Sequence, residues 1–224
     1  MIKQLQKQLR SLSAKARAQA AEKISQLGEQ ARPCVPDLIE ALIDPDREVR
    51  VQAAVALGFL EAVEAVNPII QLLQDEDEMV RSVAVGILSF LKDARANQPL
   101  LQLLVDKNPD IRDRTLRALG RIGDPAAVQP LIRALKDPVP FVRWGAAVGL
   151  GFLGSSEAIR SLINLVLFDE DQGLRWRAVE ALGNIGNRKA IRPLHRIIED
   201  ENEDPDVRTA AVIALNKIKT IKTD

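Results

Sequence analysis

An arginine recurs along this chain at an almost constant interval, and this repeat constrains the fold more than any other feature. Each of these arginines follows a β-branched residue or a leucine; they are Arg50, Arg81, Arg112, Arg143, Arg175 and Arg208. Their successive positions differ by 31, 31, 31, 32 and 33 residues. An aspartate stands six residues before each of the first five arginines: Asp44, Asp75, Asp106, Asp137 and Asp169. A period of this length is typical of solenoids built from stacked helix pairs.

The residues around each arginine have the periodicity of a buried helix face. Small residues stand three and four positions later and a large apolar residue stands seven later, as at Ala53, Ala54 and Leu57. These offsets fall on one side of an α-helix, so they predict the buried stripe of a second helix in each repeat. Preceding segments such as PLIRALKD have the same spacing and predict a first helix, with proline in its opening turn. An earlier unit around Arg17 fits the same frame.

The segments LIRALKD, FVRWGAAVGLGFLG and DPDREVRVQAAVALG resemble HEAT-like repeats. The resemblance is to the short repeats of phycobilin lyase subunits and of related proteins of phycobilisome turnover, and it covers essentially the whole chain. It implies an all-α fold: a right-handed α-α superhelix of about seven helix-turn-helix repeats, forming one HEAT-like solenoid over residues 1–224. We expect the helix at 1–10 and the tail KTIKTD to cap its two ends.

The overall charge and composition exclude several classes of partner. The chain has 31 Lys and Arg against 31 Asp and Glu, so its net charge gives no reason to expect nucleic acid or a membrane surface. Its apolar runs are too short for a membrane span. One cysteine and no apparent signal peptide fit a cytoplasmic protein.

Residues opposite the buried stripe form the predicted binding groove. Offsets of +2, +5 and +9 from each arginine point away from the core, and +9 is phenylalanine in three units. One unit has arginine at all three offsets, and two tryptophans stand at +1 of consecutive units. The predicted groove residues are Phe59, Phe90, Arg114, Arg117, Arg121, Trp144, Val148, Phe152 and Trp176. An exposed apolar strip of this kind is typical of a binding surface.

Each feature of this groove has a second interpretation. The aromatic residues can instead pack in the seams between neighbouring second helices. The three arginines can simply line a solvated helix face. The arginine and aspartate ladder is interpreted as scaffold, because stacked ions at the turns satisfy one another and the helix ends.

The sequence offers little for catalysis. His195 is the only histidine, which excludes histidine triads and multi-histidine zinc sites. Cys34 has no histidine near it in sequence to activate it, and no phosphate-binding loop is present. We therefore expect no catalytic residue, no metal and no resident cofactor.

Three functions remain open at this stage. The first is a scaffold that holds a protein in the groove, which the resemblance places in phycobilisome assembly or degradation with a phycobiliprotein subunit as partner. The second is a subunit of a phycobilin lyase or chromophore-detaching protein, paired with a second HEAT-repeat chain. In that case arginines 114, 117 and 121 would pair with bilin propionates, while the tryptophans and Phe152 would cover its rings. The third is an adaptor in an unrelated pathway.

Overall fold

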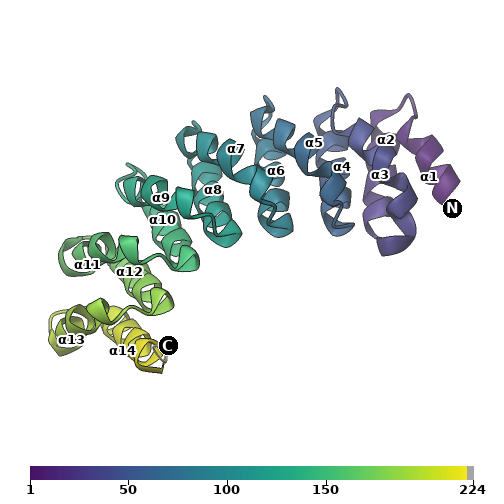
Figure 1. Cartoon of the computed structure of the whole chain (residues 1–224). Helices are drawn as coiled ribbons and strands as arrows, with labels where there is room; N and C mark the ends of the chain where they lie inside the picture. The colour runs from purple at the N-terminus through teal and green to yellow at the C-terminus, as the bar shows by residue number, and fades with distance from the viewer. Residues whose placement is uncertain (221–224) are drawn as a thin grey trace. The chain divides into compact units, whose positions relative to one another are not determined.

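The computed structural model describes residues 1–220, which form 14 α-helices joined by short turns and 3-10 segments, with no strand among these residues. The chain divides into two compact units, Met1–Leu103 and Leu104–Asp224. Figure 1 shows how, within each unit, helices succeed one another in pairs. The predicted all-α repeat fold is confirmed. That the array acts as a single solenoid over 1–224 stays a prediction.

The first unit holds three helix pairs and one further helix. Its α-helices are α1 (Ile2–Leu9), α2 (Ala14–Ser25), α3 (Val35–Ala41), α4 (Arg47–Phe59), α5 (Val66–Gln71), α6 (Glu78–Leu91) and α7 (Asn97–Gln102). The 3-10 segments are η1 (Gly28–Cys34), η2 (Val63–Ala65), η3 (Leu72–Gln74), η4 (Ala94–Ala96) and η5 (Leu103–Val105), the last of which crosses the unit boundary. The predicted N-terminal cap is α1, which pairs with α2.

The second unit begins with a second helix and continues as three pairs. Its α-helices are α8 (Pro109–Ile122), α9 (Val128–Ala134), α10 (Pro140–Leu153), α11 (Ile159–Phe168), α12 (Gln172–Ile185), α13 (Ile191–Glu199) and α14 (Pro205–Thr220). The 3-10 segments are η6 (Pro125–Ala127), η7 (Ser156–Ala158) and η8 (Arg188–Ala190). The first two residues of the predicted tail cap, 219 and 220, belong to α14, and the remaining four lie outside the described residues.

Local chemistry explains where the second helices begin and end. Asp46 is the N-cap of α4, and its carboxylate accepts hydrogen bonds from the N–H groups of Glu48 and Val49. Asp77 caps α6 in the same way. These side chains satisfy N–H groups that have no partner inside the helix. At the other end, α8 stops at Gly123, whose φ of 85° is a left-handed conformation that glycine adopts without steric cost.

The second helices of the second unit approach one another closely because they meet through glycine. A Cβ added to Gly120 in α8 would lie 2.5 Å from the carbonyl oxygen of Gly149 in α10. A Cβ on Gly149 would lie 2.5 Å from the carbonyl oxygen of Leu116. Backbone meets backbone at this crossing, so a larger side chain at either position would push the two helices apart.

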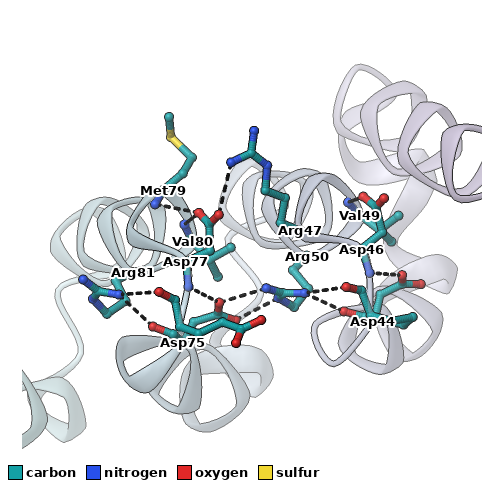
Figure 2. Close-up of polar contacts among 12 residues, drawn as sticks. Asp44, Asp46, Arg47, Val49, Arg50, Asp75, Asp77, Met79, Val80 and Arg81 are labelled. Carbon is teal, nitrogen blue, oxygen red and sulfur yellow. Dashed lines mark hydrogen bonds and ion pairs between the residues drawn. The ribbon is translucent and has the colours of Figure 1, made fainter.

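The arginines and aspartates form a ladder that joins one repeat to the next (Figure 2). In the first unit, the Arg50 Nε and Nη2 groups donate to both carboxylate oxygens of Asp75 in the following turn, each at 2.8 Å. Its Nη1 donates to the carbonyl oxygen of Asp44 in its own turn at 2.8 Å. Arg17 binds Asp44 and Arg112 binds Asp137 in the same two-pronged way. The structural interpretation of the ladder is confirmed for these pairs.

Two later rungs differ from the sequence pattern. Arg143 contacts Asp171 through one nitrogen at 3.4 Å, instead of the aspartate six residues before the next arginine. Arg175 binds Glu203, which lies in the lengthened turn of the last repeat, at 3.2 and 2.7 Å. The insertion therefore moves the acceptor without removing the rung.

Burial and ion pairing shift the pKa values of the ladder aspartates in opposite directions. Burial alone would raise the pKa of Asp44, but hydrogen bonds from Arg17 and from the Asp46 N–H lower it below its ordinary value. The pKa of Asp137 is lowered by the same balance, with Arg112 as the partner. Both carboxylates are therefore held in the charged form that the ladder needs.

Candidate functional site

Two of the predicted groove residues lie in the first unit, at the ends of second helices. Phe59 is the last residue of α4 and Phe90 lies in the last turn of α6. Their side chains are 70% and 59% exposed. The seam interpretation would have buried both rings, so these two positions have the exposure that a groove requires.

In the second unit the predicted residues lie on three adjacent second helices, α8, α10 and α12, and α14 is the fourth second helix of this row. We use the term second-helix face for the surface made by offsets +1, +2, +5 and +9 from the repeat arginine on these four helices. The face is described below from α8 toward α14, and Figure 1 shows the order of the helices.

The three arginines of α8 have three different environments. Arg114 is exposed and forms no hydrogen bond or ion pair with residues 1–220. Arg117 is bound to Asp113 one turn earlier, with its Nε 3.0 Å from each carboxylate oxygen. The Arg121 guanidinium lies over the ring of Phe152 in α10, 5.5 Å from its centroid. Within residues 1–220, the cations of Arg114 and Arg121 therefore have no carboxylate partner.

Phe152 completes the +9 series, with its side chain 48% exposed beneath Arg121. Val148, one turn earlier on α10, is half-buried. Gly145, also on this helix, is buried: a Cβ there would overlap the Asp113 carboxylate. This part of the second-helix face is thus apolar along α10 and cationic along α8.

Trp144 has the character of both a seam residue and a groove residue. Its indole Nε1 donates a hydrogen bond to the Asp171 carboxylate, the N-cap of α12, at 3.1 Å. Its ring lies against Gly173, where an added Cβ would be 2.8 Å from the ring carbon Cζ2. The rest of the half-buried ring faces a surface hollow. The polar edge of the indole therefore joins two repeats while its apolar body stays accessible.

That hollow belongs to the second-helix face. It has a volume of about 530 Å³ and lies between α10, α12 and α14. Residues lining it include Trp144, Trp176, Arg177, Ala210 and Ile213. The guanidinium of Arg177 stacks on the Trp176 ring at 4.5 Å and also pairs with Glu180 at 3.1 Å.

Sequence reasoning missed the contribution of α14. The map of outward offsets ended one repeat too early, although the same offsets from Arg208 indicate Thr209, Ala210 and Ile213. All three line the hollow. Ile213 is 53% exposed and adds an apolar side chain to the lining of the hollow.

The other chemistry-bearing residues lie apart from this face. His195 is exposed on α13, while Cys34 is fully buried, and burial together with the nearby Asp37 charge raises the pKa of its thiol. In residues 1–220 there is no group of three or more His, Cys, Asp or Glu side chains that could hold a metal ion. None of the helices in that range is both long and apolar enough to cross a membrane.

The repeat pattern and the helix pairs can be compared with known proteins at this point. The family model for HEAT repeats matches residues 2–84, 35–113, 97–172 and 159–223. This chain belongs to the HEAT-repeat family. None of the proteins with curated descriptions matches the HEAT-repeat chain by sequence.

Among solved structures, the HEAT-repeat chain is similar to the complex of CpcE and CpcF of phycocyanin lyase from Nostoc sp. PCC7120. The match has 26% identity and a TM-score of 0.61, and it covers 97% of this chain and 94% of that one. An archaeal HEAT-like repeats protein from Thermococcus onnurineus NA1 matches at 16% identity with a TM-score of 0.62, over 98% and 97% of the two chains. At that identity the archaeal match supports the fold alone.

Proposed function

We propose that this HEAT-repeat chain is a protein-binding scaffold and that the second-helix face of the second unit holds the partner. The observation that carries the proposal is the hollow of about 530 Å³ lined by Trp144, Trp176 and Ile213. Bulky aromatic side chains at the centre of an exposed depression are typical of the residues that contribute most to protein–protein binding.

The charges next to the hollow indicate what the partner segment offers. Arg114 and Arg121 are exposed on α8 without a carboxylate partner in residues 1–220, and Phe152 extends the apolar surface toward them. A segment with an apolar anchor for the hollow and acidic residues toward α8 is complementary to this arrangement. The neutral net charge of the whole chain leaves this local charge to determine the orientation of the partner.

The likeness to a phycocyanin lyase complex supports a role in phycobilisome assembly or degradation. The partner proposed on this basis is a phycobiliprotein subunit or a second HEAT-repeat chain. The proposed setting is the cytoplasm, and no bound cofactor is part of the proposal.

Binding of a phycobiliprotein subunit, measured by calorimetry, tests the proposal. Ile213→Asp places a charge in the hollow, and we expect it to weaken binding at least tenfold. Ile43→Asp is the matched control, because Ile43 is 85% exposed in the turn that follows the first helix of another repeat. Equal affinities for the two variants, or no binding by the unmodified chain, would contradict the proposal.

A second candidate function is that of a phycobilin lyase or chromophore-detaching subunit. The similarity to the lyase complex favours it. Arginines 114 and 121 would then pair with bilin propionates, and the tryptophans and Phe152 would contact the rings. The present chain would act by positioning the chromophore, in company with a second repeat chain. A change in visible absorption when an open-chain tetrapyrrole is added to the chain alone would favour this function.

A further inference from the structure

The hollow of the second-helix face has a smaller neighbour further along α12 and α14, which pack against each other. This second hollow has a volume of about 130 Å³, and Glu180, Ala214 and Lys217 line it together with residues that also line the first. The shared residues are Trp176, Ala210 and Ile213. Ala210 and Ala214 are four positions apart, so the second hollow lies about one helical turn beyond the first. The two hollows therefore form one groove, here called the α12–α14 groove.

The charged side chains along the α12–α14 groove differ between its two ends. Arg177 and Glu180 lie near the middle and pair with each other at 3.1 Å. Asp206 is exposed in the first turn of α14, and its carboxylate forms no hydrogen bond or ion pair with residues 1–220. Lys217 is exposed eleven positions later, and its Nζ donates to the Asn184 side-chain oxygen at 3.0 Å, with no carboxylate bound in the same range. An acidic end and a basic end, about 16 Å apart, are therefore open to a partner.

The lining of the groove offers few hydrogen-bond partners to an extended peptide. An extended segment has unpaired backbone N–H and C=O groups, and burying such groups costs free energy. The indole N–H of Trp144 already donates to Asp171, and the Thr209 hydroxyl already donates to the carbonyl oxygen of Pro205. Among the described residues that line the two hollows, only Gln172 has a side-chain amide. An α-helix pairs most of its own backbone groups, so this lining favours a helical ligand over an extended one.

We infer that the α12–α14 groove binds an amphipathic helix of the partner, which lies along α12 and α14 with a basic residue toward Asp206 and an acidic residue toward Lys217. Apolar side chains three or four positions apart on that helix are one turn apart, which matches the offset between the two hollows. This inference rests on the proposed function, because it specifies the part of the partner that the hollow holds. The acidic residues proposed toward α8 lie outside this helix.

Two photo-crosslinking variants of the full chain measure the conformation of the bound segment. Benzoylphenylalanine replaces Thr209 in one variant and Lys217 in the other, and the probe is a phycobiliprotein subunit. The two positions are exposed and eight residues apart on α14, about 12 Å along its axis. We expect their crosslinks to fall about eight residues apart on one helix of the subunit. An extended segment covers the same length in about four residues, and crosslinks with that separation would overturn the inference.

The same experiment separates a failure of this inference from a failure of the proposed function. Benzoylphenylalanine at Ile43, which is exposed in the first unit, is the control and should give no crosslink. If the subunit does not bind, or binds Ile213→Asp and Ile43→Asp equally, the proposed function fails and the inference fails with it. If binding depends on Ile213 but neither groove position crosslinks, or the crosslinks fall on separate elements of the subunit, only the inference fails.

Exchanging the two end charges tests the direction of the bound helix. Asp206→Lys combined with Lys217→Asp reverses the charges of the groove and leaves the net charge unchanged. We expect this double variant to bind the subunit at least fivefold more weakly at low salt, with a smaller difference at high salt. Glu22→Lys combined with Lys23→Glu exchanges two exposed charges on α2 and is the matched control. Circular dichroism verifies that each variant folds, and equal affinities for the two double variants would contradict the charges assigned to the helix.

Discussion

At the scale of single residues, the arginine that recurs in each repeat makes the contacts that connect neighbouring repeats. It binds the carbonyl oxygens of its own turn and the carboxylate of the next, so one side chain links three segments. This role was predictable from the spacing of Arg and Asp alone. The acceptor used by Arg175 was not, because an insertion in the last turn replaces the aspartate by Glu203.

Removing one rung tests how much the ladder stabilises the fold. Arg112→Gln leaves Asp137 in a largely buried position without its two-pronged partner, with both side chains 12% exposed. We expect the free energy of unfolding to fall by about 2–3 kcal/mol, as for charged hydrogen bonds that are partly buried. Urea denaturation measures this. Arg47→Gln removes an exposed pair with Asp77 and should cost much less; equal losses would contradict the account.

The pKa values of the acidic partners predict how stability depends on pH. The pKa values of Asp44 and Asp137 are lowered in the folded chain from 3.8, so their pairing contributes fully above that value. The contribution is lost as the pH falls through the lower, folded-state pKa. Unfolding measured from neutral pH down to about pH 3 should show stability decreasing below about pH 4. Asp137→Asn should flatten that decrease, and an unchanged slope would show that other groups cause it.

At the scale of helices, the close contact between α8 and α10 sets the surface on which the candidate site lies. Alanine at position 149 is a better helix former than glycine by about 1 kcal/mol, so propensity alone predicts stabilisation. The Cβ would instead meet the carbonyl oxygen of Leu116 at 2.5 Å. We expect Gly149→Ala to lower the melting temperature by several degrees.

Gly58→Ala provides the control for that prediction. A Cβ at Gly58 would meet the tip of the Ile87 side chain, which can rotate away, and not a backbone atom. Its melting temperature should change less than that of Gly149→Ala. The opposite ranking would mean that the helices of the second unit separate easily.

Helix periodicity also determined how much of the candidate site was predictable. It placed Phe59, Phe90 and Phe152 on the outward side of their helices, where the structure shows them exposed. Periodicity could not decide whether Trp144 packs in a seam or faces the groove, because offset +1 lies at the edge of the helix, against the N-terminus of α12. Helix periodicity did not predict the ion pair between Arg117 and Asp113, because that pair depends on the conformations of the two side chains.

At the scale of the molecule, a repeated local pattern determines the fold class, because each helix pair has the same buried face and the same turn. The residues of the candidate site, in contrast, differ from one repeat to the next. Trp144, Trp176 and Ile213, which line the hollow, come from three successive repeats, so no single repeat contains the site. The identity of the partner depends on that combination and on Arg114 and Arg121 beside it.

The most direct test of the central claim is the emission of Trp144 and Trp176, the only tryptophans of the chain, during titration with a phycobiliprotein subunit. We predict a saturable change in tryptophan emission that is lost in Ile213→Asp and kept in Ile43→Asp. An open-chain tetrapyrrole added alone should leave its own visible absorption unchanged. Binding of the subunit without any change in tryptophan emission would place the site elsewhere on the chain and contradict the account.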